Sequence, residues 1–136
     1  MSGEKQKLKM NESKSLRLVD FDVKKGHVTR TFDRWFELFM AQATLRGYDV
    51  VAGSEPEVPT DEDYKTGQGA SDTDKTLRDA NKKGFNELLL CCRNNVTALS
   101  VVRKAKTKDY AGGLLSKALK ELRAEFEPTG MFEKWV

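Results

Sequence analysis

Residues 31–47 read TFDRWFELFMAQATLRG, and this stretch decides the fold. Six of its apolar side chains recur at intervals of one, three and four residues, which places them on one face of an α-helix. They are Phe32, Trp35, Phe36, Phe39, Met40 and Ala43. Thr31 or Asp33 can cap the start of the helix, and Gly47 can end it after Arg46. Because four of the six side chains are aromatic and bury large areas, we expect this helix to anchor the core.

Three further helical patterns follow along the chain. We expect a long helix at about 72–93, a shorter one at about 96–104, and a last one that begins at 114 and ends before Pro128. A proline cannot continue a helix and restricts the residue before it, so the last boundary is well defined. The pattern therefore predicts an all-α fold, a compact bundle of about four to five helices.

Two details of these helices can be checked against a structure. Gly84 lies inside the long helix, where glycine costs about 1 kcal/mol relative to alanine. We therefore expect a neighbouring helix to approach closely at this position. In the short helix, Val96, Leu99 and Val102 are expected to face the core.

The predicted core joins the aromatic stripe of the first helix to the leucines and phenylalanines of the later ones. Its members are Phe32, Trp35, Phe36, Phe39, Phe85, Leu88, Leu89, Leu99, Leu115, Leu119, Leu122 and Phe126. A chain of 136 residues is long enough for one domain with a single core of this kind.

The domain organisation follows from where the periodicity begins and stops. Residues 1–15 are rich in lysine and show no periodicity, so they are predicted to be a disordered basic arm. Residues 16–130 form the helical domain, and residues 131–136 resemble the start of a further helix. Within the domain, residues 52–73 are predicted to form a long, mobile acidic loop.

The charge is unevenly distributed, although its formal net value is only +3. Residues 1–30 contain eight Lys or Arg against four Asp or Glu, and residues 75–136 contain thirteen against seven. Residues 49–74 contain only one basic residue against eight acidic ones. This asymmetry is compatible with nucleic-acid contact or with head-to-tail self-association.

Candidate catalytic and metal-binding residues are few. His27 is the only histidine and lies in a polar stretch, so we interpret it as a solvated loop residue. Cys91 and Cys92 are adjacent and follow three leucines, so they are expected to be buried rather than nucleophilic. Two thiols and one histidine do not complete a four-ligand zinc site. We therefore expect a protein that is not an enzyme and has no metal, cofactor or small-molecule substrate.

The remaining candidates for function are basic side chains in the second half of the chain. The possible nucleic-acid contacts are Lys82, Lys83, Arg103, Lys104, Lys106 and Lys108. RNA binding through them would be weak, electrostatic and salt-dependent. Solvated helix faces explain the same pattern, so this alternative stays open.

The sequence also predicts where the protein is found. No stretch approaches the roughly 18 apolar residues of a membrane-spanning helix. The N-terminal lysines are not followed by the apolar segment of a secretory signal. With its adjacent cysteines expected to stay reduced, the chain is predicted to be intracellular and cytoplasmic, without membrane contact.

Five stretches in a fixed order carry a resemblance to a known family. They are FDRW at 32–35, RGYDVV at 46–51, ANKKGFNELLL at 80–90, AKTKDY at 105–110 and LKELRAEFEP at 119–128. In this order they resemble the Gag polypeptide of copia-type LTR retrotransposons, over roughly residues 16–136. The last stretch has Leu119 where such proteins often have a tryptophan.

The resemblance implies a fold like the N-terminal domain of a capsid protein, which assembles into particles around element RNA. Trp35, Phe36, Leu88, Leu122 and Phe126 would then be core residues that keep the module rigid. The leading hypothesis is a structural Gag-like capsid protein or fragment that forms homo-oligomers and packages RNA. The alternatives are a nucleic-acid-binding helical module and a co-opted helical adaptor that binds a partner protein.

Overall fold

The computed structural model describes residues 17–53, 57–68 and 70–127, and in these ranges the protein is all-α without any strand. Its elements are α2 (Phe32–Arg46), the 3-10 turn η1 (Asp49–Val51), α3 (Asp61–Thr66), α4 (Asp72–Cys91), α5 (Val96–Arg103) and α6 (Leu115–Phe126). This confirms the predicted class and a compact bundle of five α-helices. The predicted arm at 1–15 and the last segment at 131–136 lie outside the described residues.

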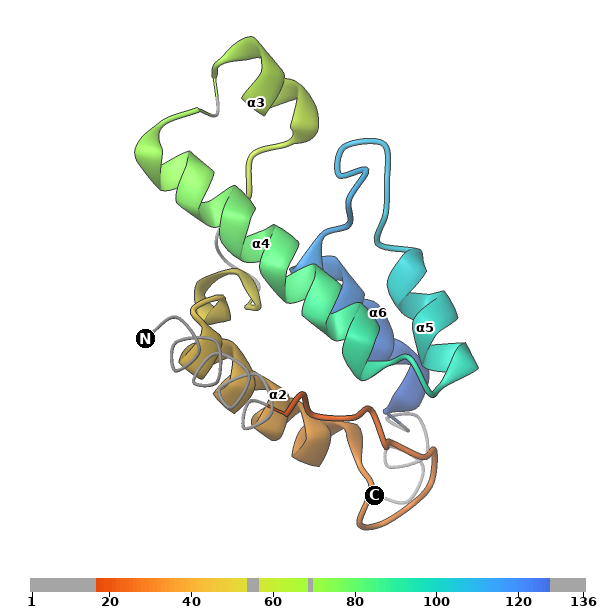
Figure 1. Ribbon diagram of the computed structural model, residues 1–136. Helices are drawn as coiled ribbons and strands as arrows, with labels where there is room; N and C mark the ends of the chain where they lie inside the picture. Colours follow the sequence, from red (N-terminus) through yellow and green to blue (C-terminus); the bar gives the residue numbers. More distant parts are fainter. Residues whose placement is uncertain (1–16, 54–56, 69, 128–136) are drawn as a thin grey trace, which may run out of the picture.

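The helices form a bundle in which α6 packs against both α4 and α5. The turn η1 contacts both α2 and α4. Figure 1 shows α2 on one side of the molecule, α4 through its centre, and α3 projecting beyond the start of α4. In the described part of the chain, no helix is long and apolar enough to cross a membrane.

The first helix begins and ends as its sequence predicts. The Thr31 side chain accepts a hydrogen bond from the Arg34 backbone amide, which caps α2. At the other end, Gly47 adopts a left-handed conformation with φ of 87°, and its amide donates to the Ala43 carbonyl. These caps fix where α2 begins and ends.

The aromatic core is completed by a segment that precedes α2. The Phe21 ring lies 4.7 Å from the Trp35 ring and 4.9 Å from the Phe126 ring, both edge-on. The Phe21 amide also donates a hydrogen bond of 2.9 Å to the Cys91 carbonyl at the end of α4. Phe21 and Val23 are buried. The predicted core does not contain them, because apolar and polar residues alternate only weakly in the segment around them.

Nine of the twelve predicted core residues are buried, and Phe36, Leu89 and Leu99 are partly buried and pack against the core. The predicted inner face of α5 is wrong at Val96, whose side chain is 84% exposed. Ala98, Val101 and Val102 are buried instead. Each residue turns a helix by about 100°, so Val96 lies roughly opposite the centre of this face.

The close approach expected at Gly84 is present. A Cβ atom at this position would lie 2.5 Å from Leu115 Cδ2 on α6 and 2.7 Å from Tyr48 Cδ1. Both distances are shorter than van der Waals contact, so a side chain cannot be added without displacing both the Leu115 side chain and the Tyr48 ring. Glycine here lets α4 pack directly against its neighbours.

The acidic connector at 52–73 differs from the predicted mobile loop over its described residues. Val58 is buried, and its carbonyl accepts a 2.5 Å hydrogen bond from the Tyr110 hydroxyl. Residues 61–66 form α3, which the Thr60 hydroxyl caps by accepting from the Asp63 amide. The connector is therefore attached to the rest of the molecule by specific side chains.

Candidate functional site

A buried polar cluster joins α4 to α2 and η1. The Glu87 carboxylate accepts hydrogen bonds from the Tyr48 hydroxyl at 2.7 Å and from Gln42 Nε2 at 3.1 Å, and it pairs with Arg46. Burial and the bond to Glu87 raise the pKa of Tyr48, so its hydroxyl stays protonated. Each carboxylate oxygen has a partner, which is typical of a structural cluster rather than a reactive one.

The residues considered for catalysis are not brought together. Burial raises the pKa of Cys91 to about 11 and that of Cys92 to about 12, so both thiols are protonated at neutral pH and poorly nucleophilic. His27 is exposed, with its Nδ1 3.1 Å from the Thr29 hydroxyl. Over the described ranges, no group of three or more His, Cys, Asp or Glu side chains is placed to hold a metal ion.

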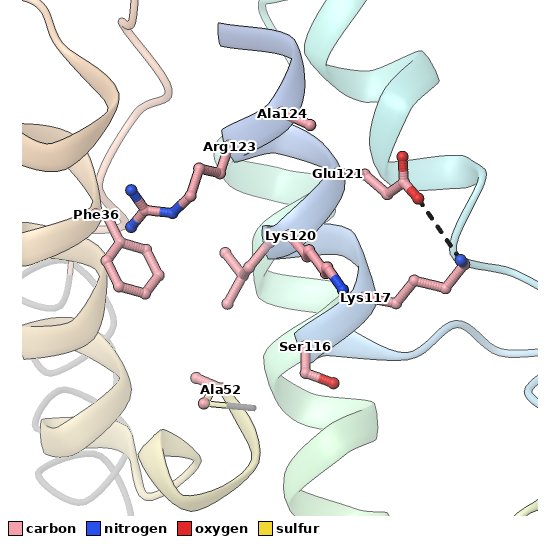
Figure 2. Close-up of a pocket in the computed structure, with 10 residues that line it drawn as sticks. Phe36, Ala52, Ser116, Lys117, Lys120, Glu121, Arg123 and Ala124 are labelled. Carbon is pink, nitrogen blue, oxygen red and sulfur yellow. Dashed lines mark ion pairs between the residues drawn. The ribbon is translucent and has the colours of Figure 1, made fainter. Parts of the chain in front are cut away.

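A surface cavity lies between α2 and α6, and we call it the α2–α6 groove. It encloses about 710 Å³. Its lining comprises Phe36, Ala52, Gly53, Ser116, Lys117, Leu119, Lys120, Glu121, Arg123 and Ala124. Figure 2 shows Phe36 from α2 facing Arg123 from α6, with Lys117 and Lys120 along the same helix. The groove thus combines an apolar floor with a mostly basic rim.

Aromatic contacts and ion pairs fix the groove's Arg123. Its guanidinium carbon lies 4.8 Å from the Phe32 ring centroid and 5.3 Å from that of Phe36. Its Nη1 lies 2.8 Å from both Asp33 Oδ1 and Glu127 Oε2. Burial lowers the pKa of Arg123, but these two hydrogen bonds outweigh it and raise the pKa above its usual value. Arg123 is therefore a fixed, permanently charged part of the wall.

The two lysines of the groove differ in their surroundings. Lys117 Nζ lies 3.6 Å from Glu121 Oε1, one helical turn away. Lys120 is exposed, and none of the described residues forms an ion pair with it. Lys120 can therefore meet an acidic partner without breaking an existing contact.

A second cavity, the α3–α4 notch, lies where α3, α4 and the turn before α6 meet. It encloses about 460 Å³. It is lined by Val58, Asp61, Tyr64, Arg78, Asp79, Asn81, Lys82, Asn86, Lys106, Tyr110, Gly112 and Gly113. Three of these side chains are basic and two are acidic, and two aromatic rings lie among them.

Hydrogen bonds hold the walls of the notch in place. Asn81 is buried; its Nδ2 donates to the Gly113 carbonyl at 2.9 Å, and its Oδ1 accepts from the Leu115 amide at 2.8 Å. The Ala111 amide donates to Asp61 Oδ2 at 2.8 Å. Because these bonds join the turn to both α4 and α3, the notch exists before any ligand arrives.

Arg78 and Tyr64 form one side of the notch. Arg78 Nη1 donates to the Pro59 carbonyl at 3.1 Å and lies 3.3 Å from Asp61 Oδ1. Its guanidinium carbon is 4.3 Å from the centroid of the Tyr64 ring, within the range of a cation–π contact. Tyr64 is 37% exposed, so part of this cation–π pair is open to solvent.

The six basic residues predicted for nucleic-acid contact are all exposed, but they do not share one surface. Only Lys82 and Lys106 line the same cavity, the notch. Lys83 instead donates to the Arg46 carbonyl at 2.9 Å, and Lys108 lines a separate cavity with Asp61 and Asp109. Arg103 and Lys104 lie at the C-terminal end of α5.

Sequence reasoning missed Arg78 and Tyr64 as members of this site. Arg78 precedes Lys82 by four residues, a spacing that places both on one side of a helix and could have indicated a shared site. Tyr64 lies within the acidic connector. It reaches Arg78 only because the connector folds back against α4, and no local sequence pattern predicts that contact.

No protein family, curated protein or solved structure matches the chain. The features that bear on function are the groove, the notch, the charge distribution and the five sequence stretches.

Proposed function

We propose that this protein is a cytoplasmic, non-enzymatic, Gag-like capsid protein or fragment of a copia-type retrotransposon, which associates with copies of itself and packages element RNA. The resemblance of the five sequence stretches supports the family. The observation that carries self-association is the pairing of a basic groove with an acidic element that projects elsewhere on the same molecule.

The α2–α6 groove is suited to receive a second copy of the chain. Phe36 and Leu119 offer an apolar floor, while Lys117 and Lys120 extend from the rim. Contacts of this kind combine burial of apolar surface with charge complementarity, which sets the register and the rate of docking.

The complementary surface is α3 with the connector before it. Glu57 and Glu62 are exposed, and Asp61, Glu62 and Asp63 form the acidic first turn of α3. Bonds from Asp61 to Arg78 and Ala111 hold α3 where it projects beyond the start of α4 (Figure 1), so it is presented to a neighbour. A groove with a basic rim on another copy is the matching partner.

Such a contact joins two different surfaces. An interface between unlike surfaces repeats from copy to copy and produces rings or open chains rather than a closed dimer. This geometry agrees with the assembly that a capsid-like module requires.

A charge-swap experiment tests the proposed contact. The double variant Lys117→Glu/Lys120→Glu reverses the charge of the groove's rim. The double variant Glu57→Lys/Glu62→Lys reverses the charge of the acidic element. We expect each double variant alone to self-associate at least tenfold more weakly than the wild type in sedimentation velocity at low salt. An equimolar mixture should regain assembly as rings or chains in which the two variants alternate, because each variant retains one native surface and the two reversed surfaces attract each other.

Lys24→Glu is the matched control, since Lys24 is exposed and lies outside the groove and α3. It should associate as the wild type does, and circular dichroism should show native helix content for all variants. A wild-type chain that stays monomeric at high concentration and low salt would refute self-association. Variants that associate normally would refute this interface.

A further inference from the structure

We propose that the α3–α4 notch binds one nucleotide of single-stranded RNA, with Lys82 and Lys106 on the phosphate and the Tyr64–Arg78 stack against the base. This inference rests on the RNA-packaging part of the proposed function and assigns that part a place on the molecule.

The balance of charges in the lining of the notch favours an anion. Lys82 and Lys106 are exposed, and neither forms an ion pair within the part of the chain that the structure describes. Of the two acidic side chains in the lining, Asp61 already binds Arg78 and the Ala111 amide. Asp79 remains as the only acidic group of the lining without such contacts in the described residues. Among the lining side chains without such contacts, the two lysines thus outnumber the one carboxylate.

The notch also offers an aromatic ring and a guanidinium group to a base. Unstacked bases bind proteins by stacking on aromatic rings and on planar guanidinium groups. The Tyr64 ring and the Arg78 guanidinium are already stacked at 4.3 Å, and bonds to Pro59 and Asp61 hold Arg78 in position. A base that stacks on the exposed part of this pair needs no rearrangement of the protein.

A polar side chain of the lining can contact the base edge. The Asn86 side chain is exposed and lines the notch, and its amide both donates and accepts hydrogen bonds. Asn81 cannot play this part, because its two amide atoms are already bonded to Gly113 and Leu115.

The shape of the site selects single strands. A cavity of about 460 Å³ lies within the usual range for small ligands and is preformed by the bonds in its walls. A base must leave its stack to enter such a notch, and in double-stranded RNA the bases are paired and stacked inside the helix. Duplex RNA could reach the lysines but not the Tyr64–Arg78 stack.

The test uses the full chain and a fluorescently labelled oligouridine of about ten nucleotides, with anisotropy measured across a salt series. For Lys82→Ala/Lys106→Ala we expect at least a tenfold loss of affinity at low salt. The slope of log affinity against log salt should also become shallower by roughly 0.7, because the two lysines neutralise one phosphate. Tyr64→Leu should lose about tenfold with an unchanged slope, because it removes stacking and not charge, while Tyr64→Phe should bind as the wild type does.

The control Lys24→Ala/Arg34→Ala removes two positive charges from exposed positions outside the notch and should change affinity by less than about threefold. An equal loss in this control, or tighter binding of duplex RNA than of the single strand, would show non-specific attraction and overturn the proposal. A single-stranded DNA of matching sequence measures the part played by the ribose hydroxyl.

Sedimentation of the same variants separates this inference from the proposed function. We expect the Lys82→Ala/Lys106→Ala variant to self-associate normally, since neither lysine lies in the α2–α6 groove or on α3. A wild-type chain that self-associates but does not bind the oligouridine would refute the notch alone. A chain that binds it through the notch and stays monomeric would refute self-association alone.

Discussion

Glu87 is an acidic side chain that folding removes almost entirely from water, leaving it 6% exposed. Desolvation of a carboxylate is unfavourable unless charged and hydrogen-bonding partners replace the lost water. Arg46, Tyr48 and Gln42 supply those partners from α2 and the residues after it. Glu87 thus links α4 to the aromatic half of the core through polar contacts.

Replacing Glu87 tests whether this cluster stabilises the fold. Glu87→Ala should lower the free energy of unfolding by about 3 kcal/mol, because it leaves Arg46 and the Tyr48 hydroxyl without their buried partner. Urea unfolding followed by circular dichroism measures the change. Glu37→Ala, an exposed site on α2, should change stability by less than about 0.5 kcal/mol. A loss below about 1 kcal/mol for Glu87→Ala would mean that the cluster is not important for stability.

The buried polar contacts could not be predicted from the sequence. Tyr48 and Glu87 are separated by 39 residues, and Gln42 and Glu87 by 45. Helical periodicity reports which residues share a face of one helix, but it does not report which polar residues on two different faces will meet. Arg46 and Glu87 therefore read as ordinary surface charges until the helices are placed.

At the scale of helices, the sequence predicts best where the pattern is long. The 15 residues of α2 and the 20 of α4 span several turns, so their apolar faces and caps are well defined. The eight residues of α5 make only about two turns. Five of them are apolar, namely three valines, one alanine and one leucine, so the pattern does not decide which face of the helix is buried. That ambiguity explains the wrong assignment of Val96.

Helix α3 was not predicted because of its composition, although its sequence contains capping residues. Its three acidic residues, in a connector that also contains prolines and glycines, suggested a solvated loop. Thr60 three residues before Asp63, and Gly67 at the end, nevertheless match the usual signals for the start and end of a helix. The notch was not predictable in the same way, because it requires the turn that contains Tyr110 to fold back onto α3.

Gly84→Ala tests the packing between α4 and α6. In an isolated helix this change is stabilising by about 1 kcal/mol. Here the new methyl group would overlap Leu115 and Tyr48, so we expect a net loss of about 1–3 kcal/mol in the free energy of unfolding. Gly112→Ala is the control, since nothing lies within 4 Å of a Cβ atom there, and it should be nearly neutral. A stabilised Gly84→Ala protein would show that α4 and α6 are further apart than described.

For the whole molecule, the buried thiols couple stability to alkaline pH. Cys91 and Cys92 have pKa values of about 11 and about 12 in the folded protein, against 9.0 for an ordinary thiol. Below pH 9 both thiols are protonated in the folded and unfolded chain, so their contribution is fully present. As the pH rises from 9 towards 11, the unfolded chain releases protons that the folded protein retains, and the folded state loses stability.

We therefore expect the free energy of unfolding to fall between pH 9 and pH 11, by up to about 1.4 kcal/mol per pH unit for each thiol. Urea unfolding at several pH values measures this slope. Cys91→Ala/Cys92→Ala should be less stable at pH 7 but should show a shallower slope above pH 9. Equal slopes in the two proteins would place the alkaline sensitivity elsewhere, for example in Tyr48, whose pKa burial also raises.

The contact between Phe21 and Phe126 also has a consequence for how the protein is made. A ribosome releases Phe21 early and Phe126 more than a hundred residues later, and the two rings meet in the finished core. A nascent chain that has produced only α2 and α4 cannot close its aromatic cluster, because α6 is still missing. Rapid translation or a holding chaperone would shorten the time during which Trp35 and its neighbours remain uncovered.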